Sequence, residues 1–166
     1  MKEILRFYIP IRPVTKKNNM QVTRGANGKA GIRQSKRYVR YEKSVLDWWF
    51  GTDGSTAKDK LQVSSPDLVE KEDDKLIKLL ENPNPLTIKV NVKAIYGLPT
   101  AQRSDLINYH AALHDILTKM GIIEDDHWKI VYSTDGSKIV IDRNSPGTLV
   151  IIEAYIDKDG NVIELE

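Results

Sequence analysis

The sequence has no cysteine among its 166 residues. Disulfide bonds, thiolate metal sites and cysteine nucleophiles are therefore excluded. No run comes near the roughly 18 apolar residues of a membrane helix, and the start, Met1-Lys2-Glu3-Ile4, lacks the apolar region of a signal peptide. From these absences we expect a cytoplasmic protein that does not enter a membrane.

Acidic residues are missing from one long stretch. Between Pro10 and Tyr41 there are nine basic residues and no acidic one: Arg12, Lys16, Lys17, Arg24, Lys29, Arg33, Lys36, Arg37 and Arg40. The chain from Asp142 onward has six acids against two bases, so the net charge of +2 conceals a strong segregation. The stretch is either a solvated basic loop or a surface for a polyanion. The complete lack of acids favours the polyanion, because Lys and Arg that neutralise nucleic-acid phosphates release bound counterions.

Composition and periodicity indicate one α+β domain over residues 1–166. The apolar fraction of 40% in a chain of this length supports a real hydrophobic core. Alternating apolar residues predict strands at 3–9, 86–96, 128–134, 138–142 and 148–156, with a Thr-Asp-Gly-Ser turn after the third and a closing hairpin at Asp159-Gly160. Helical spacing predicts helices at 36–50, 66–81 and 104–120. We therefore expect a mixed, mostly antiparallel sheet with two or three helices.

Two segments between these predicted elements have no periodic pattern. A Gly- and Asn-containing basic loop is expected from Pro10 to about residue 35, where Ser35 caps the next helix. Residues 51–65 are low in apolar residues and contain turn formers, so we expect a mobile loop there. Within helix 36–50, the adjacent Trp48 and Trp49 diverge by about 100°. We expect one of them to pack in the core.

The helix at 104–120 is expected to bury one stripe and to expose the other side. The stripe comprises Leu106, Tyr109, Leu113, Ile116, Leu117 and Met120, with Asn108, Asp115 and Lys119 roughly opposite. Asp105 stands at the start of the helix, and Glu124, Asp125 and Asp126 follow the glycine stop at Gly121. Neighbouring carboxylates repel each other unless they are solvated or share a cation. If the chain folds back after Gly121, these acids approach one divalent ion.

The same acids also have simpler interpretations that do not involve a metal ion. Asp105 is also typical of a helix N-cap, Asp125-Asp126 of an exposed turn, and Asp115 of a solvated helix position. A different metal site is suggested by His110 and His114, which lie one helical turn apart, with His127 as a third ligand. The glutamate of the zinc-protease pattern His-Glu-x-x-His is missing, because residue 111 is alanine.

Several segments, in order, resemble the RusA family of Holliday-junction resolvases, endodeoxyribonucleases of phages and prophages. Ile9-Pro10-Ile11-Arg12-Pro13 through Lys16-Lys17 is similar to the family's N-terminal "IPGxPvpK" segment, and Tyr38 to Glu42 to its first helix. The motif Asp-x-Asp-Asn-x-x-Lys-x-x-x-Asp-Ala-Leu, then Gly-x-x-x-Asp-Asp, resembles Asp105 to Leu117 followed by Gly121 and Asp125-Asp126. Pro146-Gly147 with the strand to Glu153 resembles the closing "PG-x-v-x-I-x-E".

The resemblance implies a homodimer that cleaves branched DNA with Mg²⁺, for which Mn²⁺ is a substitute. By position, Asp105 and Asp126 match the family's acids, and Asp125, Asp115 or Glu124 are candidate substitutes for the acid that is missing. The expected catalytic residues are Asp105, Asp126 and Asp125, and the expected metal ligands are Asp105, Asp115, Asp125 and Asp126. Residues 51–85, which the matched segments leave out, are an apparent insertion. The expected DNA-binding residues are Arg12, Lys16, Lys17, Arg24, Arg33, Lys36, Arg37 and Arg40. The chain departs from the motif at Ile107 and Ala111, which replace an acid and a catalytic lysine; Lys16 or Lys17 is a candidate substitute. A DNA-binding protein with degraded catalysis is therefore the alternative.

Overall fold

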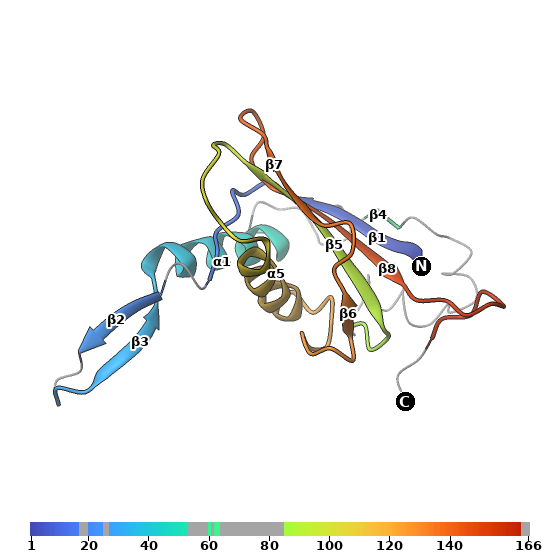
Figure 1. The fold of residues 1–166 in the computed structure, drawn as a ribbon, viewed down its shortest axis with the longest axis horizontal. Helices are drawn as coiled ribbons and strands as arrows, with labels where there is room; N and C mark the ends of the chain where they lie inside the picture. Colours follow the sequence, from blue (N-terminus) through green and yellow to red (C-terminus); the bar gives the residue numbers. More distant parts are fainter. Residues whose placement is uncertain (17–19, 25–26, 53–59, 61, 64–84, 164–166) are drawn as a thin grey trace.

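The chain folds as a mixed sheet with two described helices packed on one face (Figure 1). The structure, a computed structural model, describes all residues except 17–19, 25–26, 53–59, 61, 64–84 and 164–166. The main sheet has the order β4-β1-β8-β5-β6, with β7 also paired to β5. The predicted α+β class with a mostly antiparallel sheet is confirmed.

Three antiparallel strands form the centre of the sheet: β1 (Lys2–Ile9), β8 (Thr148–Ala154) and β5 (Val90–Leu98). The first two agree with the predicted strands, whereas β5 begins and ends later than the predicted 86–96. The short strand β4 (Gln62–Val63) pairs with β1, so part of the segment predicted as a mobile loop is an edge strand. The predicted helix at 66–81 lies outside the described residues.

Two short strands share the other edge of β5. β6 (Val131–Ser133) pairs in parallel with the start of β5, and β7 (Lys138–Ile141) pairs in parallel with its end. The turn between β6 and β7 therefore interrupts an edge strand and does not fold the two strands against each other. Asn91 holds this interruption: its buried Oδ1 accepts hydrogen bonds from the Asp135 amide at 2.7 Å and the Ser133 hydroxyl at 2.5 Å.

The basic stretch forms a two-stranded ribbon, which corrects the expectation of a loop. Strand β2 (Met20–Arg24) pairs antiparallel with β3 (Ala30–Gln34), and the ribbon extends away from the body of the domain (Figure 1). The strands are only 5 residues each, and the Asn and Gly residues between them masked the alternation in the sequence. We call residues 20–34 the arm.

Helix α1 (Lys36–Trp49) follows the arm directly. The Ser35 hydroxyl accepts a hydrogen bond from the Tyr38 amide at 3.2 Å, which confirms the predicted cap. The two tryptophans separate as expected: Trp49 is buried and donates from Nε1 to the Met120 carbonyl at 3.1 Å, whereas Trp48 is half-buried with the Lys60 ammonium over its ring.

Helix α5 (Leu106–Lys119) buries the predicted stripe against the sheet. Tyr109 stacks on Tyr96 of β5 with ring centroids 5.1 Å apart. Asn108, predicted on the solvent side, is instead only 5% exposed. The reason is α1, which packs beside that flank and whose Glu42 accepts a hydrogen bond from Lys119 at 2.5 Å. In the part of the chain that is described, neither helix has the length and apolar character needed to cross a bilayer.

Gly147 offers a test of the packing between β1 and β8. A Cβ at this position would lie 2.3 Å from the Tyr8 hydroxyl oxygen and 2.5 Å from the Ile9 carbonyl oxygen. We expect Gly147→Ala to lower the free energy of unfolding in urea by about 1–3 kcal/mol through overpacking. Gly31→Ala is the control, since its nearest neighbour would be 3.7 Å away; equal stability of the two variants would contradict the described register.

Candidate carboxylate site and nucleic-acid interface

Three aspartates from α5 and the segment after it form a carboxylate cluster: Asp115, Asp125 and Asp126. The pKa of Asp126 is raised, first by partial burial, then by a hydrogen bond with Asp125 and by the negative charges of Asp115 and Asp125. The Asp126 amide also donates to the Asp125 carboxylate at 2.7 Å. The sequence could not show that Asp115 faces these two acids. We call these three residues the carboxylate cluster.

A fold-back of the chain after Gly121 brings the cluster together. Gly121 has φ of +74°, which ends α5 in the left-handed region that glycine adopts without strain. The next residues pair with Leu86, whose amide donates to the Ile122 carbonyl at 2.8 Å and whose carbonyl accepts from the Glu124 amide at 3.1 Å. Ile122 and Ile123 are buried, so the return path is fixed by the core.

Asp105 stands apart from this cluster. It precedes the first residue of α5, and Asp115 lies ten positions further on, about 15 Å along the helix axis at 1.5 Å per residue. The Asp105 carboxylate accepts a hydrogen bond from the Asn108 amide group at 3.3 Å and makes no side-chain cap to the first-turn N–H groups. A joint cation site of Asp105 and Asp126 thus stays a prediction, and the cluster that the structure forms includes Asp115 instead.

Lys16 contacts the carboxylate cluster. Its ammonium forms an ion pair with Asp115, and both side chains are half-buried. Of the two lysines considered as substitutes for the missing catalytic lysine, Lys16 therefore lies beside the acids, while Lys17 is outside the described residues. One cation against three carboxylates leaves the cluster with excess negative charge.

The contact between α1 and α5 continues this charged region and includes Glu42, for which the sequence predicted no role in the site. Among the described residues, its buried Oε2 has no partner in hydrogen-bonding geometry, and neither has the hydroxyl of Tyr38 one turn earlier. Burial, followed by the charges of Glu42 and Asp115, raises the pKa of Tyr38, so the phenol stays neutral. The signal was available: Glu42 is the one acid among the basic residues of the first two turns of α1.

The chemistry of the cluster fits a hard cation, but its present arrangement is incomplete. Carboxylate oxygens are the ligands that Mg²⁺ prefers, and it needs only one or two of them besides waters and a substrate phosphate. Within the described ranges, no three His, Asp or Glu side chains are grouped closely enough to hold a metal ion together. Asp126 with Asp125 or Asp115 is therefore the pair that would hold Mg²⁺.

The two helix histidines form a pair on the flank of α5 away from α1, where His110 is buried and His114 is half-buried. Their ring centroids lie 5.5 Å apart, and His110 Nδ1 is 3.1 Å from the Tyr96 hydroxyl. Burial lowers the pKa of both rings, that of His114 to about 4, and both Nε2 atoms are buried without a partner. His127, the suggested third ligand, is exposed, and its Nδ1 accepts from the Lys129 amide at 3.1 Å. The zinc site stays a prediction.

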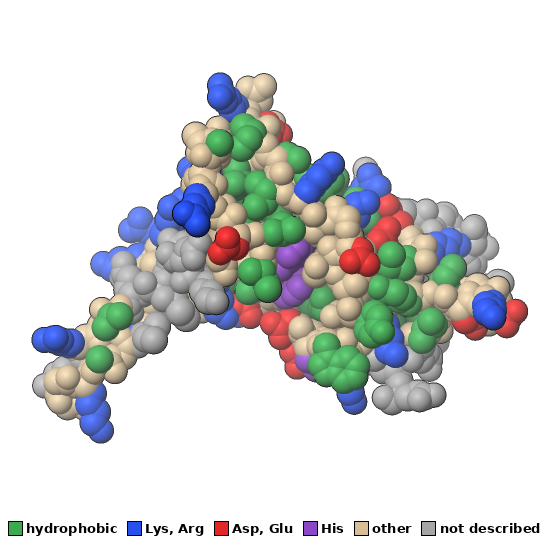
Figure 2. Space-filling view, viewed as in Figure 1, with side chains coloured by type: hydrophobic (Ala, Val, Ile, Leu, Met, Phe, Trp, Pro, Cys, Tyr) green, Lys and Arg blue, Asp and Glu red, His purple; other side chains and the backbone are tan. Residues whose placement is uncertain are grey.

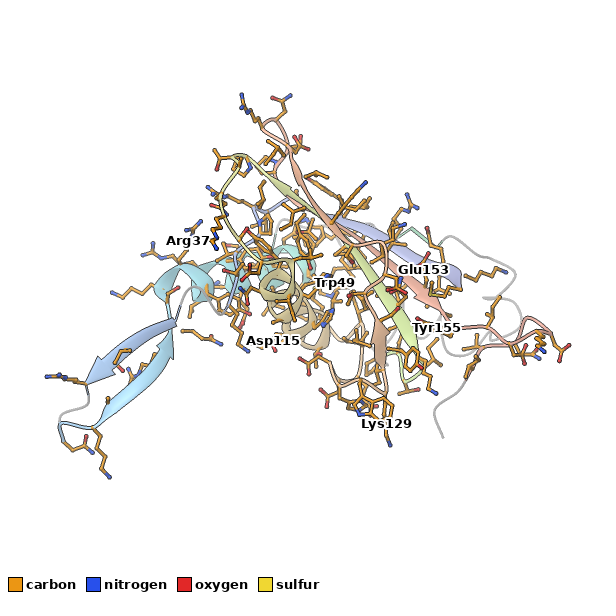
Figure 3. The ribbon with its side chains drawn as sticks, viewed as in Figure 1. Arg37, Trp49, Asp115, Lys129, Glu153 and Tyr155 are labelled. Carbon is orange, nitrogen blue, oxygen red and sulfur yellow. The ribbon has the colours of Figure 1, made fainter. Side chains whose placement is uncertain are left out.

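Exposed basic side chains cover the arm and the start of α1. Arg24 and Arg33 are exposed on the arm, and Lys36, Arg37 and Arg40 on α1. Among the described residues none of these five forms an ion pair, whereas Lys16 is paired with Asp115. Figure 2 shows Lys and Arg side chains over the arm and α1, with acidic side chains beneath α5; Figure 3 labels Arg37 and Asp115, one in each region.

Comparison with known proteins adds no relative: no family model matches the chain, and no curated protein matches it. The resemblance described above therefore rests on the motif residues themselves.

The half-buried His114 predicts a pH-dependent loss of stability. Its folded-state pKa of about 4 lies below the ordinary 6.5, so the stability it contributes is present above pH 6.5 and is lost as the pH falls through 4. We expect His114→Gln to reduce the fall in unfolding free energy between pH 7 and 4 by up to roughly 3 kcal/mol, measured by urea titration at each pH. His127→Gln is the exposed control, and identical pH profiles for all three proteins would contradict the burial.

Proposed function

We propose that this protein is a Mg²⁺-dependent endonuclease that acts as a homodimer on branched DNA such as Holliday junctions. The carboxylate cluster beside an acid-free basic surface is the observation that supports this proposal most directly. Acids supply metal ligands, and the basic surface supplies sequence-independent attraction to phosphates. The RusA resemblance supports the same reaction class from the order of its motifs.

In the proposed reaction the chain's own residues would bind Mg²⁺, orient the substrate phosphate and stabilise the negative charge that develops on it. Mg²⁺, when bound, supplies a water of lowered pKa and neutralises charge on the leaving oxygen. Asp126 with Asp125 or Asp115 would hold it. The Lys16 ammonium, now paired with Asp115, is placed to stabilise negative charge that develops on a phosphate at the cluster.

The raised pKa of Asp126 gives the proposal a pH signature. A carboxylate binds Mg²⁺ only when it is ionised, and Asp126 takes up a proton at a higher pH than an ordinary aspartate does. Cation binding at the cluster is therefore lost earlier on acidification than at an isolated carboxylate. Mg²⁺ in turn favours the ionised form by offsetting the repulsion from Asp115 and Asp125.

The arm and α1 would form the DNA surface. A two-stranded ribbon has dimensions that fit the major groove of B-DNA, and the arm projects far enough from the body to reach one (Figure 1). Arg24 and Arg33 on the arm and Arg37 on α1 would then contact phosphates. The arm would approach the duplex while Lys16, just before it, keeps the cluster close to the backbone.

A second candidate is a DNA-binding protein of the same type without cleavage. Ile107 is 73% exposed, and Ala111 is also exposed one turn further along α5. These are the positions where the resemblance expects an acid and a lysine, so α5 offers neither a metal ligand nor a cation at these two positions. The separation of Asp105 from the cluster favours the same candidate.

Cleavage of a four-way DNA junction in Mg²⁺ or Mn²⁺ distinguishes the two candidates. For a nuclease we expect Asp126→Asn to lower the rate by about 100-fold or more while junction binding persists, because only the charge that holds the cation is lost. Asp159→Asn, in the exposed turn near the C-terminus, should leave the rate unchanged. Junction binding with no cleavage by the unaltered protein at any metal concentration would support the second candidate.

The salt dependence of DNA binding tests the arm. If Arg24 and Arg33 each neutralise one duplex phosphate, the double variant Arg24→Gln/Arg33→Gln should reduce the slope of log K against log[salt] by about 2. Lys158→Gln, a change in the exposed turn near the C-terminus, should leave the slope unaltered. An unchanged slope in the arm variant would exclude the arm from the interface.

A further inference from the structure

A small pocket lies at the N-terminal end of α5, away from the carboxylate cluster. It has a volume of about 160 Å³ and is formed by three segments: the residues after β1, the first turn of α1 and the loop before α5. Its lining includes Pro13, Thr15, Arg37, Arg103, Ser104 and Tyr109. None of the residues that line it is acidic. Arg103 and Ser104 have no role in the site described above.

The wall formed by the loop before α5 is held in place by one side chain, Gln102. Its Oε1 accepts a hydrogen bond from Arg12 at 3.2 Å, and its Nε2 donates to the Tyr109 hydroxyl at 3.0 Å. Tyr109 is buried and stacked on Tyr96, so this wall is anchored to the sheet. The pocket is thus built by residues from three separate parts of the chain.

The positive charge of the residues that line the pocket favours binding of an anion. Arg37 and Arg103 both line it, both are exposed, and neither forms an ion pair with any described residue. An anion bound between two guanidinium groups is attracted by both charges, and their planar donors match phosphate oxygens. The adjacent N-terminus of α5, whose first-turn amides receive no side-chain cap from Asp105, adds a favourable potential.

The size of the pocket restricts the anion. A volume of about 160 Å³ corresponds to roughly five water molecules, enough for a phosphate group and its ester oxygens. Sites for whole nucleotide-sized ligands are larger, about 300 Å³ or more. The volume therefore suits a single phosphate group better than a complete nucleotide.

We propose that this pocket binds one phosphodiester group of a nucleic-acid backbone, through Arg37, Arg103 and the Ser104 hydroxyl. The assignment rests on the proposed function in taking DNA as the ligand. Arg103 and Ser104 are thereby assigned to substrate binding.

NMR titration of the full-length protein tests the pocket directly. The probes are inorganic phosphate, a short single-stranded oligonucleotide with hydroxyls at both ends, and the same oligonucleotide with a 5′-phosphate, each against chloride at equal ionic strength. We expect the hydroxyl-ended oligonucleotide to shift the amide signals of residues 103–107 and the Nε–H signals of Arg37 and Arg103. Shifts with only the 5′-phosphate oligonucleotide or inorganic phosphate would overturn the backbone assignment, as would no shift.

Substitutions connect these signals to affinity. Arg37→Gln and Arg103→Gln should each weaken oligonucleotide binding by about 10- to 150-fold, because each removes a charge-assisted contact, and together they should abolish the shifts. Arg37→Lys and Arg103→Lys should recover part of the affinity, because lysine restores the positive charge but not the paired donors of the planar guanidinium group. Lys158→Gln is the control, and circular dichroism verifies folding. Wild-type affinity in the Gln variants would refute the pocket.

These experiments distinguish failure of the pocket assignment from failure of the nuclease proposal. If Asp126→Asn abolishes cleavage but the Arg37 and Arg103 variants bind and cleave normally, the pocket assignment fails and the nuclease stands. If the protein binds the hydroxyl-ended oligonucleotide through the pocket but never cleaves a junction, the pocket assignment holds and the nuclease fails.

Discussion

Helix α5 can bury only one stripe against the sheet, and the use of its two flanks follows from this constraint. The core stripe of Tyr109, Leu113, Ile116 and Leu117 packs on β5 and its neighbours. One flank then meets α1, where pairing of charged side chains offsets the cost of partly removing them from water. Asp115 pairs with Lys16 and Lys119 with Glu42 on this side. The two histidines occupy the other flank, where their rings stay neutral.

The elements that the sequence predicted are those specified by local patterns. Strands β1 and β8 have apolar alternation over many residues, α1 has a serine cap, and α5 ends at a glycine with positive φ. Each signal depends on neighbours within a few positions, so the sequence contains it in full. The start of β5 was misplaced because residues 86–89 alternate as well, yet only Leu86 forms a bridge, with Ile123.

The features that the sequence did not predict depend on contacts between distant segments. Asp115 is indistinguishable from a solvated helix residue until the chain after Gly121 returns beside it and Lys16 arrives from near β1. The pocket at Arg103 likewise requires three segments, and Gln102 shows its role only when Arg12 and Tyr109 are on either side of it. The parallel pairing of β6 and β7 with β5 could not be deduced, because a turn signal does not specify which strand lies next.

The interruption between β6 and β7 has a consequence for the behaviour of the folded chain at high concentration. A long, straight, unpaired edge strand is a template on which other chains add and aggregate. Here that edge is divided into strands of 3 and 4 residues by the Asp135-Gly136 turn, and Lys138 is exposed at the start of the second. The buried amide of Asn91 thus keeps this side of the sheet unsuitable for templating fibrils.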